Sequence, residues 1–560
     1  MDAAWLHGWS GVALAYCAVQ VPMLAGLARG GAKLHKYLLS PALAAPLTAV
    51  AGIGVAVASQ WLPGLSAAHG AIQWSLGVAV SATLGYVGGQ RYVGKAISDR
   101  AYQRGSMVAE QSKVTPRPAR KSRDAAIKLA GREVRAEDET KHFKMIGTTG
   151  TGKSTAIQEI LASALARGDR AIIADPDGGY AQRFFDQVRG DRLLNPFDAK
   201  SMKWDLFGEI DNAYDVEQLA RSFIPDHEGS DRSWRGYART FFTAVTRQTH
   251  DAGIRSVAEL YRLLVVADTK ELRTLLAGTP AQPFLDEHNS RMFDSIRSVT
   301  ASAVSALEYV AEQKTKELSV REWVRSDAPG VLFMPYKAGQ IAALRSTISG
   351  WMRLAIFETM HSREESYASA SDKKKPLWFV VDELDALGQI DGLKDALVRL
   401  RKFGGRCVLG FQSIAQVSST YGHGDAHTIV ENCGNTLILR CSASEGGGTA
   451  RFASQLIGDR EVLRTTVSTS HRPAEFFESK TRSEHFSVEP ALMPSQIEQL
   501  PDLAGYLKFA SEPQWQRVTL TPLAVRPKHQ ERGWNAGKNI GADPVVHRQN
   551  ARAHQSFDYE

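Results

Sequence analysis

The sequence predicts an α/β fold with a parallel sheet, interrupted by an all-helical insertion and preceded by a membrane-spanning helical hairpin. Three observations support this prediction. A glycine-rich segment, 147–155, stands between a short apolar run and a helix-like pattern. A second apolar run, 377–381, ends in two acidic residues. Two segments near the N-terminus, 38–62 and 64–90, contain no Asp, Glu, Lys or Arg.

The composition is that of a globular, multidomain chain in a reducing compartment. With 560 residues and 43% apolar content, the chain has room for several domains with packed cores. Its formal net charge of +7 is modest for this length, so charge is informative only segment by segment. The four cysteines have no C-x-x-C spacing, which argues against a disulfide framework or a cysteine metal site.

The membrane region is expected over residues 1–90, with spans near 41–61 and 71–89. About 20 apolar residues cross a bilayer, and each segment is long enough. The loop between them lacks Lys and Arg, whereas basic residues flank both outer ends, namely Arg29, Lys33, Lys36, Arg91, Lys95 and Arg100. The positive-inside rule places the loop outside and the main body in the cytoplasm. The apolar run 9–28 is either a third span or an interfacial helix.

A basic linker is expected at 91–123, where nine Lys/Arg residues oppose two acidic ones. Such a juxtamembrane stretch is attracted to anionic lipid. The same charge would also hold a nucleic acid. Both interpretations remain open.

The glycine-rich segment has the G-x-x-x-x-G-K-S pattern of a phosphate-binding P-loop. Its backbone N–H groups converge on phosphate oxygens, and the following helix N-terminus adds partial positive charge. Lys153 is expected to reach the β- and γ-phosphates of ATP, and the Ser154 hydroxyl to ligate Mg²⁺. The expected nucleotide-binding residues are Gly147, Thr148, Thr149, Gly150, Thr151, Gly152, Lys153, Ser154 and Thr155.

The nucleotide-binding domain is expected in two parts, 124–210 and 326–524, around an all-helical insertion at 211–325. The insertion shows helical periodicity without strand-like alternation. In the first part, the strand 170–174 ends in an acidic turn. Its Asp175 and Asp177 either touch the nucleotide site or simply form the turn.

The second acidic motif follows the apolar run 377–381, which suits a central parallel strand covered on both faces. Asp382, at the carboxyl end of this strand, is expected to hold Mg²⁺ directly or through water. Glu383 is placed to polarise a water molecule for attack on the γ-phosphate.

Three further residues are candidates for the catalytic site. Gln412 follows the strand 406–411 and is positioned to sense the γ-phosphate or orient the attacking water. Arg401, in a basic helix expected over 389–403, and Arg440, after the strand 435–439, are arginine-finger candidates because guanidinium stabilises transition-state charge. Structural salt bridges are the alternative role for both arginines.

Taken together, these motifs resemble the type IV secretion coupling proteins, the TraD/TrwB-like family of conjugative DNA pumps. The membrane hairpin, 147–154, the helical insertion and 380–384 carry the resemblance, and 401–405 followed by 409–413 is its most family-specific part. The match runs from residue 38 to about residue 522.

This resemblance implies a RecA-like motor domain that assembles into a ring, a hexamer, at the bacterial inner membrane. Each active site would lie between neighbouring copies, which favours Arg401 as the finger supplied in trans. The implied partners are DNA, the relaxase and its relaxosome proteins, components of the secretion channel, and the lipid bilayer. DNA contacts are expected mainly at phosphates. Arg232 and Arg235 beside Trp234 are candidates for such contacts, or they are ordinary helical-surface charge.

The tail, 525–560, is polar and is predicted to be disordered, and its last five residues are either a docking peptide or unbound.

Other functions of the chain remain open at this point. The chain is alternatively a chromosome-segregation translocase, a membrane platform that uses nucleotide as a switch, or an ATPase that passes only proteins. A platform would not need Glu383.

Overall fold

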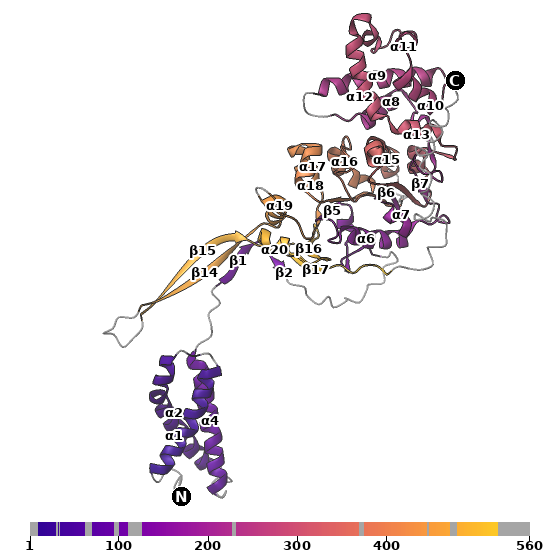
Figure 1. Cartoon of the computed structure of the whole chain (residues 1–560). Coiled ribbons are helices and arrows are strands. Elements are labelled where there is room, and N and C mark those ends of the chain that lie inside the picture. Colours follow the sequence, from indigo (N-terminus) through magenta and orange to yellow (C-terminus); the bar gives the residue numbers. More distant parts are fainter. Residues whose placement is uncertain are drawn as a thin grey trace, which may run out of the picture. The chain divides into compact units, whose positions relative to one another are not determined.

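The computed structural model describes residues 9–29, 32, 34–61, 70–93, 100–109, 126–226, 231–368, 375–444, 447–470 and 479–524. The predicted tail and much of the predicted linker lie outside these residues. The chain divides into two compact units, one comprising 1–101 with 463–485 and the other 102–462 with 486–560. Each unit is described by itself (Figure 1).

The described residues of the N-terminal unit include the helices α1 (Trp9–Arg29), α2 (Leu34–Trp61) and α4 (Gly70–Val93), which pack against one another. The predicted spans 41–61 and 71–89 lie within α2 and α4, and the additional apolar run forms α1. Tyr16 donates a hydrogen bond of 3.1 Å from α1 to the carbonyl of Pro41, and Gln20 donates one of 2.8 Å to Ser40. Within the described residues, two windows are long and apolar enough to cross a membrane, Val12–Arg29 and Lys36–Ile53.

The main body is built on a ten-stranded sheet with the order β2-β17-β16-β13-β5-β12-β11-β6-β10-β7. Strands β13 through β7 in this order are parallel, whereas β16 is antiparallel to β13 and to β17. The α/β fold is therefore confirmed. The strand bounds are β2 (Val108–Ala109), β5 (Phe143–Ile146), β6 (Arg170–Pro176), β7 (Arg192–Leu193), β10 (Val331–Tyr336), β11 (Leu377–Val381), β12 (Gly405–Phe411), β13 (Asn435–Ile438), β16 (Ala504–Lys508) and β17 (Trp515–Thr519).

Helices cover both faces of this sheet, as Figure 1 shows. One apolar core contains Phe143 and Met145 of β5 together with Ile157 and Ile160 of α6. Alternate strand residues such as Ile146 enter the other core, which α15 to α18 help to form. The central strands are therefore buried on both sides, as their largely apolar sequences require. The helix bounds are α6 (Lys153–Arg167), α7 (Gly179–Phe184), α15 (Ile341–Ala368), α16 (Leu393–Leu400), α17 (Ile414–Tyr421) and α18 (His423–Asn432).

The insertion between β8 (Lys203–Trp204) and β10 consists mainly of helices. These are α8 (Ala213–Phe223), α9 (Arg232–Asp251), α10 (Val257–Tyr261), α11 (Thr269–Leu275), α12 (Ser290–Ala303), α13 (Ala306–Glu312) and α14 (Val320–Arg325). One detail departs from the all-helical expectation, because the two-residue strand β9 (Glu317–Leu318) pairs in parallel with β8. This pairing joins the end of the insertion to its beginning.

The basic helix predicted over 389–403 is shorter than expected. It begins at Leu393, because Gly392 adopts the left-handed conformation with φ 74° and ends a preceding turn. Arg401 lies in a single 3₁₀ turn after the helix. The sequence prediction was wrong here because the periodicity of 389–392 gave no sign of this turn.

Smaller elements complete the described chain. A hairpin, β3 (Lys128–Leu129) and β4 (Arg132–Glu133), precedes the short helix α5 (Ala136–Glu139). A separate three-stranded sheet has the order β1 (Arg100–Gly105), β14 (Asp459–Ser470) and β15 (Ser479–Pro490). In the sequence, α19 (Gly448–Ile457) precedes β14 and α20 (Pro494–Glu498) follows β15.

Candidate functional site

The glycine-rich segment forms the turn between β5 and α6, at the carboxyl edge of the parallel sheet. Its Lys153 side chain folds back on the loop and donates a 2.6 Å hydrogen bond to the carbonyl of Gly147. Burial lowers the pKa of Lys153, while the nearby Asp382 and Glu383 oppose this shift. The loop thus holds a buried cation whose present partners are backbone carbonyl groups of the same turn.

The first link between distant motifs joins Ser154 to Asp382, at the end of β11. The Ser154 hydroxyl donates to Oδ2 of Asp382 at 2.7 Å, and the Tyr180 hydroxyl donates to the same oxygen at 2.7 Å. The other carboxylate oxygen, Oδ1, is buried and has no hydrogen-bond partner among the described residues. A serine hydroxyl beside a carboxylate with an unused oxygen is a donor set that fits Mg²⁺.

A second link runs from the loop to Glu383 through Gln412. The Thr149 hydroxyl donates to Oε1 of Gln412 at 2.8 Å, and Nε2 of Gln412 donates to Glu383 at 3.1 Å. Burial and then the charge of Asp382 raise the pKa of Glu383. A raised pKa makes this carboxylate a stronger base towards a water molecule.

The strands that carry these residues approach one another very closely. A Cβ atom on Gly410 of β12 would lie 2.3 Å from the carbonyl oxygen of Asp382. The carbonyl of Gly410 in turn accepts a 2.9 Å hydrogen bond from the N–H of Leu384. A side chain at position 410 would therefore displace the turn that carries Asp382 and Glu383.

The acidic turn after β6 has a structural role in this arrangement. The carboxylate of Asp175 accepts hydrogen bonds from the backbone N–H groups of Tyr180 at 2.9 Å and Ala181 at 2.7 Å. Burial raises the pKa of Asp175 to about 7. Asp177 has a positive φ of 57° and donates its N–H to the carbonyl of Tyr336. Asp175 therefore positions Tyr180, whose hydroxyl reaches Asp382.

The two arginine-finger candidates lie in different places. Arg440 follows β13 beside the loop, where its carbonyl accepts the N–H of Thr148 at 2.9 Å and its guanidinium pairs with Asp502 at 2.6 Å. Arg401 precedes β12, whereas Gln412 follows that strand. The structure therefore brings Arg440, but not Arg401, to the edge of the sheet that carries the glycine-rich loop of the same chain.

Sequence reasoning missed two tyrosines at this site. Tyr180 was not singled out because it lies beyond the acidic turn with no motif around it. Tyr336, at the end of β10, has a buried hydroxyl with no partner in the described part of the chain, and burial together with the neighbouring carboxylates raises its pKa. The one available signal was position, because Tyr336 ends β10 and Tyr180 follows β6, the parallel strand next to it.

Comparison with known families gives one match that covers most of the chain. The model of the type IV secretion-system coupling protein DNA-binding domain matches residues 126–521. Coupling protein TraD of Escherichia coli (strain K12) is 28% identical over 421 residues, which is 74% of this chain and 57% of TraD. The chain thus spans just over half the length of this relative. A VirD4 protein of Bartonella henselae is 32% identical over 97 residues.

Solved structures of the coupling protein TrwB share the fold. An unbound form lacking its N-terminal region is 28% identical, with a TM-score of 0.67 over 77% of this chain and 95% of that one. Two further TrwB structures, one with the ATP analogue ADPNP and one with ADP and Mg²⁺, each have a TM-score of 0.65 and 28% identity. Each of these two covers 76% of this chain and 95% of the TrwB chain.

Proposed function

Because the chain belongs to the family of type IV secretion-system coupling proteins, we propose that it is a membrane-anchored ATPase that couples ATP hydrolysis to the transfer of DNA into a secretion channel. The observation that carries this proposal is the contact of Ser154 with Asp382, next to the chain of hydrogen bonds from Thr149 through Gln412 to Glu383. Together these contacts unite a phosphate-binding loop, a metal-binding pair and a base.

The loop 147–155 would bind ATP, with its backbone N–H groups and Lys153 contacting the phosphates. Mg²⁺, held by Ser154 and Asp382, would supply positive charge against the phosphate oxygens. Glu383 accepts a proton from the attacking water, and Gln412 fixes the orientation of Glu383 relative to the loop. This role for Mg²⁺ is supported by the relative TrwB, which has been solved with ADP and Mg²⁺.

Neither of the two arginine-finger candidates is free at the site of its own chain in the part that the structure describes. Arg440 is paired with Asp502, and Arg401 precedes the strand whose opposite end carries Gln412. We therefore assign Arg401 to the site of a neighbouring copy in a ring, where its guanidinium stabilises the transition state. The ring would stand at the inner membrane, anchored by the N-terminal helices, and receive a relaxase–DNA complex.

The full chain in lipid nanodiscs, assayed for ATP turnover with and without single-stranded DNA, tests this function. Turnover that rises several-fold with DNA supports a DNA-coupled motor. Turnover that ignores DNA but rises with the relaxase protein alone would indicate an ATPase for protein substrates. Nucleotide binding without turnover under all conditions would contradict the motor and favour a nucleotide-controlled recruitment platform.

A further inference from the structure

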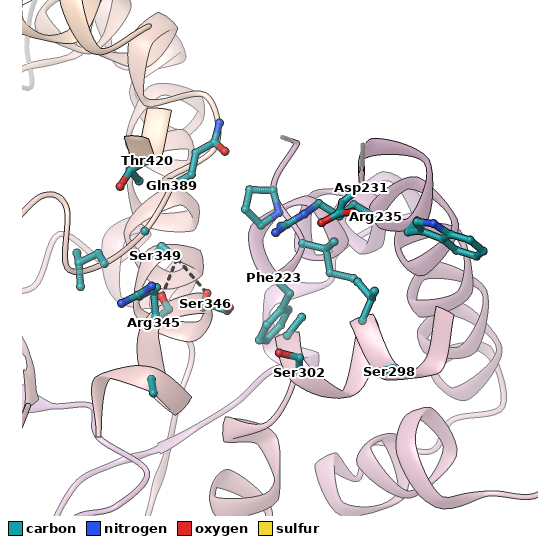
Figure 2. A pocket seen from close by; sticks show the side chains of 18 of the residues that line it. Phe223, Asp231, Arg235, Ser298, Ser302, Arg345, Ser346, Ser349, Gln389 and Thr420 are labelled. Carbon is teal, nitrogen blue, oxygen red and sulfur yellow. Dashed lines mark hydrogen bonds between the residues drawn. The ribbon is translucent and has the colours of Figure 1, made fainter. Parts of the chain in front are cut away.

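A cleft of about 1120 Å³ separates the helical insertion from the nucleotide-binding domain (Figure 2). Helices α9 and α12 line one wall, and α15, α17 and the turn before α16 line the other. This volume exceeds the roughly 300–1,000 Å³ of ordinary small-molecule sites. The cleft therefore suits a segment of an extended ligand.

Hydrogen-bond donors face the cleft from both walls. Figure 2 shows Arg235, from α9, opposite Arg345, from α15. Within the described part of the chain, the Arg235 guanidinium forms no hydrogen bond or ion pair, and Arg345 uses only its Nε atom. The hydroxyl groups of Ser298, Ser302 and Ser346 also line the cleft without a hydrogen bond to a described residue. Guanidinium groups only donate hydrogen bonds, so the matching ligand must be rich in acceptors.

Two carboxylates, Asp231 and Asp294, line the same cleft, so their formal charge balances that of Arg235 and Arg345. Asp294 is next to Arg297, with which it interacts electrostatically. Asp231 lies near Arg235 at the start of α9. Arg297 does not itself line the cleft, but its charge offsets that of Asp294. Arginines also match the geometry of phosphate better than lysines do.

The Arg345 side chain also contacts the turn that follows β11 and carries Asp382 and Glu383. Its Nε donates a 2.9 Å hydrogen bond to the carbonyl of Ala386. The N–H of Ala386 in turn donates to the carbonyl of Glu383 at 3.2 Å. These two hydrogen bonds connect Arg345 to the backbone of Glu383, the residue proposed as the base. Movement of Arg345 towards a ligand would therefore shift the position of Glu383.

A second contact ties the insertion to the same region. Arg353 of α15 is buried and donates to Asp391 at 3.2 Å, and on its other side to the carboxamide of Gln218 in α8 at 2.7 Å. Arg353 thus links α8 of the insertion to the segment that follows Glu383.

We propose that this cleft binds the phosphodiester backbone of a single-stranded nucleic acid between Arg235 and Arg345, and that Arg345 transmits the binding to Glu383. The inference rests on the proposed function and names the place where DNA would stimulate turnover. The volume holds a few nucleotides of one strand but not a base-paired helical turn. The two arginines on opposite walls would contact phosphates and not bases, so binding is independent of sequence.

Salt dependence of binding gives the most direct test. The full chain in nanodiscs is titrated with a fluorescent oligothymidylate over a range of NaCl concentrations. Each phosphate contact to a single strand contributes about −0.7 to the slope of log K against log [salt]. Arg235→Ala and Arg345→Ala should each make the slope shallower by about 0.7, and the double variant by about 1.4. Arg291→Ala, an exposed arginine of α12 outside the cleft, is the matched control and should leave the slope unchanged.

A second measurement separates transmission from binding. Arg345→Lys keeps the positive charge but loses the Nε contact with Ala386. It should bind the oligonucleotide with an unchanged salt slope while the DNA-stimulated increase in turnover falls several-fold. Slopes for Arg235→Ala and Arg345→Ala equal to that of Arg291→Ala, with all variants showing the wild-type thermal unfolding, would overturn the proposal. If the wild type turns over ATP with DNA stimulation but these slopes stay unchanged, only the cleft assignment fails. If the wild type has no turnover, the proposed function fails first, and the slopes still test the binding site.

Discussion

The hydroxyl of Ser154 donates a 2.7 Å hydrogen bond to Oδ2 of Asp382, a residue 228 positions further along the chain. The same oxygen accepts the Tyr180 hydroxyl, while Oδ1 is buried without a described partner. The parallel order of β5, β12, β11 and β6 explains this meeting, because the turns that carry these residues follow strands of one sheet and lie at one edge. The Asp382 carboxylate is thus held from two sides with one oxygen left over.

Replacing Tyr180 by Phe should remove one of the two hydrogen bonds that position the Asp382 carboxylate, without disturbing the fold. The lost hydrogen bond to a carboxylate is worth about 1–2 kcal/mol, so turnover should fall roughly five- to thirtyfold. The Mg²⁺ concentration for half-maximal turnover should rise as well. Tyr261→Phe is the control, because that hydroxyl also bonds a carboxylate, Glu308, but lies in the insertion. An unchanged Mg²⁺ dependence in Tyr180→Phe would show that Tyr180 has no positioning role.

Buried His142 should make stability depend on pH. Its Nδ1 accepts the N–H of Cys407 at 3.0 Å, and Nε2 lies 2.8 Å from the carbonyl of Leu397, so the ring is held neutral. Burial lowers the pKa of His142 from 6.5 to about 4. The unfolded chain therefore binds more protons between these values. The contribution to stability is complete above pH 6.5 and is lost as the pH falls towards 4.

Denaturant unfolding at pH 7.5 and pH 5 measures this effect. The free energy of unfolding should fall by about 2 kcal/mol more in the wild type than in His142→Gln. Glutamine is the informative variant because its amide accepts and donates without titrating. The comparison also removes the opposite contributions of buried Asp175 and Glu209, whose pKa values are raised to about 7. Equal pH dependence in both proteins would contradict the assignment to His142.

Helix packing in the N-terminal unit depends on Gly85. A Cβ atom there would lie 2.2 Å from the backbone carbonyl of Val19 in α1, whereas one on Gly88 would meet the flexible Leu47 side chain at 3.2 Å. Gly85→Ala and Gly88→Ala add the same methyl group and gain the same helix propensity. Thermal unfolding of the full chain in nanodiscs should therefore show that Gly85→Ala lowers the stability by about 1–3 kcal/mol, whereas Gly88→Ala changes it little. Equal effects would contradict the close α1–α4 packing.

Membrane topology gives a further prediction. If α1 crosses the membrane together with α2 and α4, the N-terminus lies on the side opposite the main body. A tag at the N-terminus should then be protected in vesicles whose cytoplasmic face is exposed to protease. A tag at the C-terminus, the control, should be cleaved. Cleavage of both tags would instead make α1 an interfacial helix.

The sequence predicted the parts of the site that depend on strand–turn–helix patterns. The loop 147–155 and the pair Asp382 and Glu383 each follow a buried strand that is apolar except for Lys144, so their common location could be inferred from fold class alone. Tyr180 could not be inferred, because its position depends on the hydrogen bonds that the Asp175 carboxylate accepts from the backbone N–H groups of Tyr180 and Ala181. The start of α16 was missed because the positive φ of Gly392 overrides the apparent periodicity.

The position of Arg401 also had to come from the structure. The basic run 399–402 shows only that a positively charged segment precedes the strand 405–411. The direction of β12 decides that Gln412, and not Arg401, reaches the site of the same chain. Likewise, no sequence pattern places Arg235 opposite Arg345, because these residues come from different parts of the chain.

The proposed role of Glu383 is to activate water at a site that binds ATP through the loop 147–155. Its most direct test compares ATP turnover and nucleotide binding in the wild type, Glu383→Gln and Lys153→Ala. We predict that Glu383→Gln binds ATP with nearly wild-type affinity while turnover falls by about 10²–10⁴, the usual contribution of a general base. Lys153→Ala should lose both binding and turnover. Wild-type turnover in Glu383→Gln would contradict the account.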